Sequence, residues 1–208
     1  MLSNFILSLI ILLGGFLRFY KLDWGEGYFF HPDEYHIAGA VGRLSFPSQM
    51  NPQFFSYGSF TTYLIYFTRL FLGTFNARFS DFSPIFIGRF YSALFSTLTI
   101  VAVYFISLKL LTIRYSLFAA ALASVVPGLI QQAHFATPES ILTFWLFLTI
   151  YLWIEYWQKK KSKFLYLSAI SLGLALGTKI VALTFLPILL LLPVWLNTSE
   201  VLRQRPRL

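Results

Sequence analysis

Apolar residues gather into long runs that short polar segments separate. A helix that crosses a bilayer needs about 20 mostly apolar residues, within a range of about 17–25. Six runs come near that length, at residues 5–19, 84–108, 116–131, 141–157, 164–178 and 180–196. The pattern predicts an all-α polytopic membrane protein with about six transmembrane helices. The first run has neither a basic flank before it nor a small-residue cleavage site after it, so we expect an uncleaved first helix.

The last two runs are short for independent spans. One interpretation is a tight helical hairpin with Lys179 at its tip. The other is one long, kinked helix.

A long segment, 20–83, separates the first two runs. Within it, apolar side chains recur at three- and four-residue steps with threonine and arginine between them, which indicates an amphipathic helix of about four turns. The apolar positions are Phe60, Tyr63, Leu64, Phe67, Leu70 and Phe71. Because this helix is short and one-sided, we expect it to lie on the membrane surface.

Composition narrows the class of protein. Of the 208 residues, 57% are hydrophobic and 12% are charged, whereas soluble domains are about 25% charged. This excludes a soluble globular domain, a disordered chain and a disulfide scaffold. The absence of cysteine excludes thiol catalysis and cysteine-ligated zinc. The basic residues are not interleaved with aromatics as on a nucleic-acid-binding surface, so we expect no nucleic-acid partner.

Charge predicts the orientation. With a cytoplasmic N-terminus and six spans, every basic cluster falls inside, as the positive-inside rule favours. The clusters are Lys109 with Arg114, Lys159 to Lys161 with Lys163, and Arg203, Arg205 and Arg207. We therefore expect a multi-pass plasma-membrane protein with both termini in the cytoplasm. The segments 20–83 and 132–140 then lie outside.

The first outer segment contains His31-Pro32-Asp33-Glu34. Proline at a first helical position predicts a helix from Pro32 to about Leu44. Its first turn places two carboxylates where free N–H groups stabilise them. Such carboxylates can accept a proton or bind a cation, and the alternative is that they only cap the helix.

The second outer segment repeats this arrangement. Thr137 is predicted to be an N-cap, followed by Pro138 at the first helical position and Glu139 at the second. His134 lies five residues before Glu139. An acid that opens an apolar span is costly and often functional, although capping explains it equally well.

Two basic residues also lie near the predicted outer face. Lys179 follows Gly177-Thr178 and can hold a phosphate as a point charge. The alternative is that the side chain of Lys179 only extends to place its charge at the membrane–water interface. Arg89, early in the second run, has the same two interpretations.

Four motifs in this order resemble glycosyltransferase-C membrane enzymes, in the branch of the protein O-mannosyltransferases and the lipid A aminoarabinose transferases. They are Arg18-Phe19-Tyr20 with His31-Pro32-Asp33-Glu34, the stretch 88–95 that starts with Gly88-Arg89, the stretch 134–139, and Gly173 to Lys179. The resemblance covers nearly the whole chain, which we interpret as one transmembrane module, 1–208.

This resemblance implies inverting transfer of a sugar from a polyprenyl-phosphate donor to a protein, lipid or glycan acceptor at the outer membrane face. Asp33 would be the general base, with Glu34 as its catalytic neighbour. The candidate substrate-binding residues are Glu139, Lys179, His134, Arg89 and His31. Asp33 and Glu139 would be the ligands of a divalent cation, Mg²⁺ or Mn²⁺, and no other cofactor is expected.

Two alternatives stay open. One is a non-catalytic membrane protein, such as a flippase, a transporter fragment or an assembly subunit. The other is half of a transferase that needs a partner, because members of this branch are usually longer. Acids gathered at one face favour the enzyme, since a transporter is expected to have an acid or a broken helix near the bilayer midplane.

Overall fold

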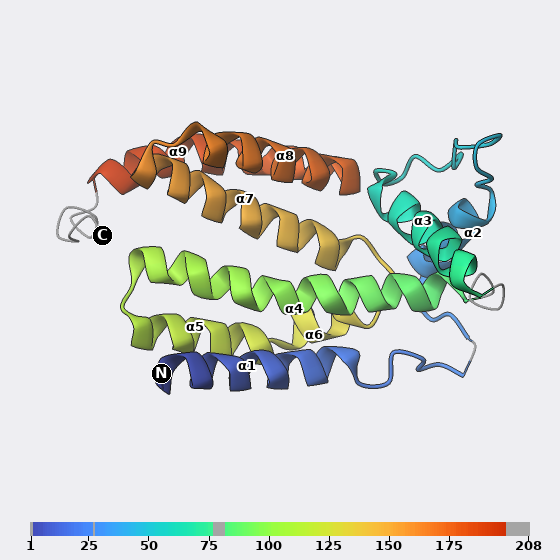
Figure 1. The fold of residues 1–208 in the computed structure, drawn as a ribbon, viewed down its shortest axis with the longest axis horizontal. Helices are drawn as coiled ribbons and strands as arrows, with labels where there is room; N and C mark the ends of the chain where they lie inside the picture. The colour runs from blue at the N-terminus through green and yellow to red at the C-terminus, as the bar shows by residue number, and fades with distance from the viewer. Residues whose placement is uncertain (1, 27, 77–81, 199–208) are drawn as a thin grey trace.

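The computed structural model describes residues 2–26, 28–76 and 82–198, and helices form nearly all of the regular structure in these ranges (Figure 1). The elements are α1 (Leu2–Phe19), α2 (Pro32–Gly42), α3 (Phe60–Phe75), α4 (Pro84–Leu110), α5 (Ile113–Val125), α6 (Pro127–Ala133), α7 (Glu139–Lys159), α8 (Ser162–Thr178), the 3₁₀ helix η2 (Ile180–Phe185) and α9 (Leu186–Thr198). The chain is an all-α polytopic membrane protein, as predicted.

The number of full-length spans is smaller than the six expected. Among the described residues, α1, α4 and α7 are long and apolar enough to cross a bilayer, and α5 with α6 makes a fourth if the bent pair counts as one span. The two C-terminal runs form shorter helices instead.

The predicted span at 116–131 is broken, with a bend of 53° between α5 and α6. Pro127 has no N–H, so the carbonyl of Ala123 has no helical donor four residues ahead. Arg18 of α1 replaces that donor: Nη2 donates to Ala123 O at 2.9 Å, and Nη1 donates to Ser124 O at 2.8 Å. Arg18 is fully buried, and its Nε donates to Ser96 Oγ of α4 at 2.7 Å. One arginine thus joins α1, α4 and the break.

The C-terminal elements form the hairpin that we expected, with its turn at Lys179. Ser171 Oγ donates to Trp145 O and Ser168 Oγ donates to Thr149 O, so α8 runs antiparallel to α7. The backbone of Lys179 is extended, with φ −158° and ψ 129°. Beyond it, α9 returns along α7, where Trp153 Nε1 donates to Leu189 O at 2.9 Å. The single kinked helix is therefore excluded.

The predicted amphipathic helix is α3, which packs with α2 against the start of α4 (Figure 1). Its face with Thr61, Thr62 and Ile65 is buried, whereas Phe67 and Phe71 of the apolar stripe are exposed. A water-soluble helix would bury the apolar stripe instead. The surface of α3 is thus suited to contact with lipid.

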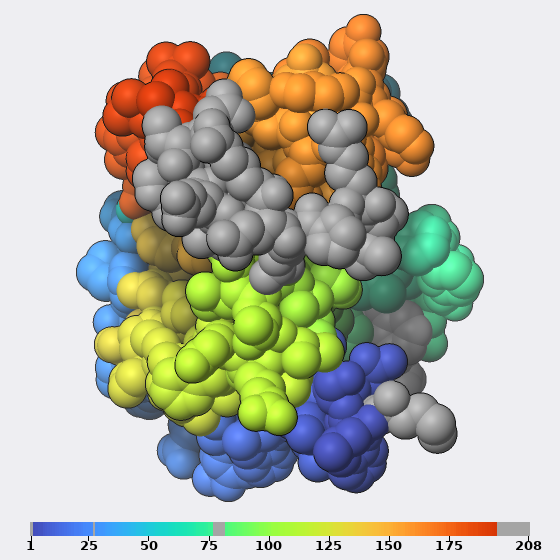
Figure 2. Space-filling model, turned by 90° about the vertical axis from the view of Figure 1, so that its left-hand side faces the viewer, coloured from blue at the N-terminus to red at the C-terminus, as the bar shows by residue number. Residues whose placement is uncertain are grey.

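The two ends of the helix bundle differ in charge. The end that holds the start of α1 and the end of α9, seen face-on in Figure 2, carries the α4–α5 and α7–α8 turns with their lysines. There the buried Glu155 pairs with Lys109 and, at 2.6 Å, with Lys159. The arginines at 203, 205 and 207 lie outside the described residues. The opposite end holds α2, α3 and the start of α7, and the candidate site lies there.

Candidate functional site

Helix α2 begins at Pro32 and ends at Gly42, so the helix start read from the sequence is confirmed. His31 is its N-cap, and its Nδ1 accepts a hydrogen bond from the backbone N–H of Asp33 at 3.2 Å. An accepting Nδ1 places the proton of the neutral imidazole on Nε2. The same Nδ1 lies 3.8 Å from Asp33 Oδ2, so His31 lies beside the candidate base.

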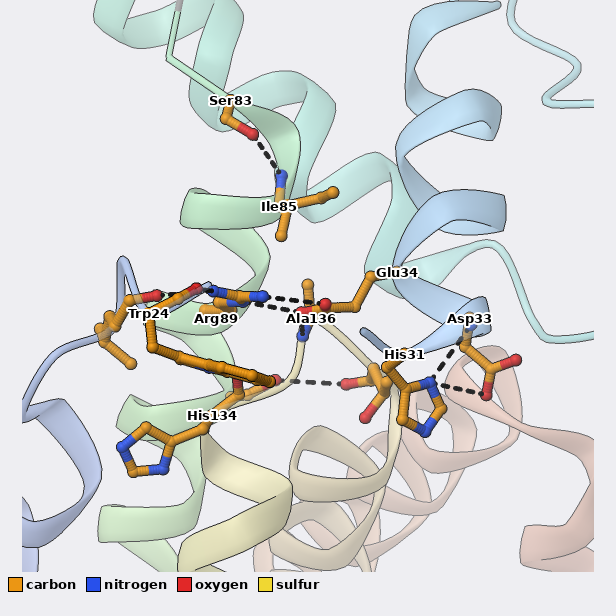
Figure 3. Close-up of polar contacts among 12 residues, drawn as sticks. Trp24, His31, Asp33, Glu34, Ser83, Ile85, Arg89, His134 and Ala136 are labelled. Atoms are coloured by element: carbon orange, nitrogen blue, oxygen red, sulfur yellow. Dashed lines mark hydrogen bonds and ion pairs between the residues drawn. The ribbon is translucent and has the colours of Figure 1, made fainter. Parts of the chain in front are cut away.

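The two neighbouring carboxylates point in different directions (Figure 3). Asp33 lies beside His31, and its side chain is 27% exposed. Glu34 is fully buried and accepts a bidentate pair of hydrogen bonds from Arg89 at 2.7 and 2.9 Å. Its Oε1 also accepts the backbone N–H of Ala136 at 2.8 Å. Of the pair, only the Asp33 carboxylate is exposed.

The guanidinium group of Arg89 also binds backbone carbonyls and an aromatic ring of the protein. Its Nη1 donates to the carbonyls of Leu22 and Trp24 at 3.0 and 2.8 Å, and its guanidinium lies 4.7 Å from the centre of the Trp24 ring. Glu34 and Arg89 therefore fasten the α1–α2 segment, α2, α4 and the α6–α7 segment together. Glu34 and Arg89 therefore bind each other and backbone groups in this structure, and the catalytic role of Glu34 and the substrate-binding role of Arg89 stay predictions.

His134 also has protein partners at both ring nitrogens. Nδ1 lies 2.8 Å from Ile130 O, and Nε2 lies 3.0 Å from Tyr20 O. Its carbonyl accepts a hydrogen bond from Trp24 Nε1 at 3.0 Å. His134 thus links α6 to the end of α1, and its expected contact with substrate stays a prediction.

Helix α7 begins one residue later than we expected. Glu139 is its first residue, and Pro138 takes the N-cap position. The Thr137 hydroxyl makes no cap but donates to Gln132 Oε1 at 3.4 Å. Glu139 still stands in the first turn, where free N–H groups favour a carboxylate.

Glu139 and Lys179 form an ion pair between α7 and the tip of the hairpin. Lys179 Nζ donates to Glu139 Oε1 at 2.8 Å, and the side chains of Lys179 and Glu139 are 28% and 32% exposed. The other carboxylate oxygen, Oε2, is buried and has no hydrogen-bond partner among the described residues. The pair therefore keeps acceptor capacity and ammonium N–H groups for a ligand.

Tyr57 links Asp33 to this ion pair, although nothing in the sequence singled it out among 12 tyrosines. Lys179 Nζ lies 4.7 Å from the centre of the Tyr57 ring. Burial raises the pKa of the Tyr57 phenol, and so do the nearby carboxylates of Asp33 and Glu139. Asp33, Tyr57, Glu139 and Lys179 therefore form one cluster, which we call the acid–lysine cluster.

The residue next to Tyr57 explains why its loop docks here. The N–H of Gly58 donates to Thr178 O at 3.0 Å. A Cβ at Gly58 would stand 2.0 Å from the carbonyl oxygen of Gly177, so only glycine allows this approach. The α2–α3 loop is thereby held against the residue that precedes Lys179.

The described residues do not form a metal site from protein ligands alone. No group of three or more histidine, aspartate and glutamate side chains among them could hold an ion. The free Oε2 of Glu139 fits a cation, but Lys179 already places a positive charge at Oε1. A Mg²⁺ or Mn²⁺ ion would need substrate phosphate oxygens as further ligands. Binding at Asp33 and Glu139 stays a prediction.

Comparison with known proteins gives the family. A family model described as dolichyl-phosphate-mannose-protein mannosyltransferase matches residues 61–203. The chain belongs to this family. The matched segment of the mannosyltransferase family contains Arg89, His134, Glu139 and Lys179, whereas His31, Asp33 and Tyr57 precede it.

One relative adds a partial match. An uncharacterised protein of Aquifex aeolicus (strain VF5) is 33% identical to this member of the mannosyltransferase family over 92 residues. The match covers 44% of this chain and 18% of that protein. The similarity thus spans only about a fifth of the relative's length.

Proposed function

We propose that this protein transfers a sugar from a polyprenyl-phosphate donor to a hydroxyl acceptor, with Asp33 as the general base. The observation that carries this proposal is the acid–lysine cluster. It holds a part-exposed carboxylate near a part-exposed ammonium group at one end of the bundle. Membership of the mannosyltransferase family supports the donor class.

The proposed reaction is a single displacement with inversion. The Asp33 carboxylate takes the proton of the acceptor hydroxyl while that oxygen forms a bond to the anomeric carbon. The bond between the anomeric carbon and the phosphate oxygen breaks, and polyprenyl phosphate leaves with the electron pair. Asp33 ends protonated and returns its proton to water. A positioned base of this kind contributes about 10²–10⁴-fold.

Lys179 acts on the leaving group. Its ammonium group has three N–H donors, and Glu139 occupies one of them at 2.8 Å. A donor fixed where charge develops stabilises the transition state more than the ground state. We infer that Lys179 binds the departing phosphate, while Glu139 holds the ammonium group in place through Oε1.

The proposed site faces the outside of the plasma membrane. The basic turns at the other end of the bundle favour the cytoplasm by the positive-inside rule. Polyprenyl-phosphate mannose and a serine- or threonine-containing polypeptide are the first substrates to test, because the description of the family names mannose and protein.

The experiment compares two aspartates of the same outer segment. The protein in lipid nanodiscs receives radiolabelled polyprenyl-phosphate mannose and serine/threonine peptides, and transfer is counted for wild type, Asp33→Asn and Asp23→Asn. Asp23 is exposed at the protein surface and is the matched control. We expect Asp33→Asn to lower the rate by about 10²–10⁴-fold and Asp23→Asn to keep it.

Two results would contradict the proposal. Wild-type transfer by the Asp33→Asn protein removes Asp33 as the base. Donor binding without turnover by the wild type supports the non-catalytic alternative or a transferase half that needs a partner.

A further inference from the structure

A cavity of about 410 Å³ lies on the exposed side of α2, outside the acid–lysine cluster. This volume is in the range of pockets that hold small ligands. The residues that line it include Phe29, Tyr35, His36, Gly39, Arg43 and Phe54. Among the described residues, neither a carboxylate nor any part of α3 lines it. The cavity therefore lies apart from the surface of α3 that is suited to lipid, and it holds a positive charge.

Arg43, at the end of α2, is held in place while its charge stays unpaired. Its Nε donates to Pro52 O at 2.7 Å. No carboxylate among the described residues lies within ion-pair distance of its guanidinium group. The terminal nitrogens therefore keep N–H donors that match the two oxygens of a carboxylate. Because the side chain is already fixed, less entropy is lost when such an anion binds.

Aromatic rings form the walls around Arg43. His36 stacks on Phe54, with ring centroids 6.1 Å apart and an angle of 15° between the planes. Phe29 and Tyr35 meet edge to face at 5.9 Å. Rings of this kind give large contact areas with little side-chain entropy to lose. The cavity thus complements a chain segment that carries a carboxylate beside apolar groups.

The cavity adjoins the candidate base. His36 follows Asp33 by three residues, so their side chains are neighbours on the surface of α2. On the other side, the ring of Phe54 lies 5.6 Å from the ring of Tyr57, which belongs to the acid–lysine cluster. Arg43 follows Asp33 by ten residues, or about 15 Å along the helix. An extended peptide spans that distance in about four to five residues.

We propose that this cavity binds the acceptor, and that Arg43 selects polypeptides with an acidic side chain about four to five residues from the accepting hydroxyl. This inference rests on the proposed function, because it names the acceptor class of the same reaction. Arg43 is too far from Asp33 to take part in the chemistry. It determines the affinity for the acceptor and not the rate of transfer.

The binding of two peptides tests the cavity without any transfer. Each peptide contains one threonine, and five residues before and after it one peptide has glutamate where the other has glutamine. Surface plasmon resonance measures their affinities for the protein in phosphatidylcholine nanodiscs. We expect the wild type to bind the glutamate peptide at least about 10-fold more tightly, as for a hydrogen bond to a charged group.

Two charge substitutions assign this preference to the cavity. Arg43→Gln removes the cation, and Lys21→Gln is the matched control, because Lys21 is an exposed cation of the same outer segment that does not line the cavity. We expect Arg43→Gln to bind both peptides as weakly as the wild type binds the glutamine peptide. We expect Lys21→Gln to keep the preference.

Gly39→Leu tests the cavity with Arg43 in place. A Cβ at Gly39 would lie 3.7 Å from Arg43 Nη1, which is an ordinary contact, and leucine favours a helix more than glycine does. The leucine side chain therefore fills the cavity without disturbing α2. We expect weaker binding of both peptides, and unchanged binding would overturn the inference.

The remaining outcomes separate this inference from the proposed function. Equal affinities of the wild type for the two peptides, or a preference that Arg43→Gln retains, overturn the inference. Arg43-dependent binding of phosphatidylglycerol vesicles in place of the peptides also overturns it and assigns the cavity to a lipid headgroup. In the transfer assay we expect Arg43→Gln to raise KM for the glutamate peptide and to leave kcat unchanged. A wild type that prefers the glutamate peptide but transfers no sugar overturns the proposed function and keeps Arg43 as the anion-binding residue.

Discussion

Successive residues of an α-helix point about 100° apart, because the helix has 3.6 residues per turn. Asp33 and Glu34 at the start of α2 therefore cannot both face the same surroundings. Glu34 points into the protein and binds Arg89, whereas Asp33 stays beside His31 with 27% of its side chain exposed. The different surroundings of the two acids follow from this difference in direction.

Glu34→Ala tests the structural part of this pair. Removal of the carboxylate leaves Arg89 buried with an uncompensated charge, which typically costs about 3–5 kcal/mol. We expect a loss of stability of this size in thermal or denaturant unfolding of the purified protein. Glu26→Ala is the control, because Glu26 is exposed in the same segment. Equal stabilities of the two variants would show that the Glu34–Arg89 pair does not hold the site together.

The sequence told us that acids open α2 and α7, because proline marks helix starts, but it did not tell us which acid is buried. Burial of Glu34 depends on Arg89, which lies 55 residues away. The position of Tyr57 in the acid–lysine cluster was equally hidden. It depends on the contact of Gly58 with Gly177, which no local pattern in the sequence reveals.

At the scale of the elements, a second buried arginine, Arg18, stabilises the bend between α5 and α6. Arg18 supplies the donors that Pro127 cannot supply to the carbonyl of Ala123. The sequence predicted one continuous span here, because the apolar run continues through Pro127. The sequence did not reveal the break, because the donor that replaces the missing N–H of Pro127 comes from Arg18 of α1.

Arg18→Met removes these donors and leaves the carbonyls of Ala123 and Ser124 without partners. Each unsatisfied buried group costs about 1–3 kcal/mol, so we expect a loss of at least about 2 kcal/mol in unfolding measurements. Arg114→Met, at an exposed arginine, is the control.

A double-mutant cycle separates this cause from general packing. In a Pro127→Ala background, the new N–H can serve the carbonyl of Ala123, so we expect Arg18→Met to cost less there. The same cost in both backgrounds would contradict the account of the break.

At the scale of the whole molecule, the basic turns and the candidate site lie at opposite ends of the helix bundle. The lysines of the α4–α5 and α7–α8 turns lie at the end that holds the start of α1 and the end of α9, and the acid–lysine cluster lies at the other end (Figure 1). The sequence anticipated this separation from alternating spans and basic turns. It overestimated the number of full spans, yet the hairpin at Lys179 kept the alternation of direction. Asp33, Glu139 and Lys179 therefore lie in one cluster, as predicted, although the number of full-length spans is smaller than predicted.

Labelling of single cysteines from the two sides of the membrane tests this arrangement most directly, since the chain has no native thiol. Tyr35→Cys marks the site end at a side chain that is 68% exposed, and Lys161→Cys marks the basic end. We expect a membrane-impermeant maleimide to modify Tyr35→Cys on intact cells, and Lys161→Cys only after the membrane is opened. Modification of both positions from the same side would contradict an outward-facing site at the end opposite the basic turns.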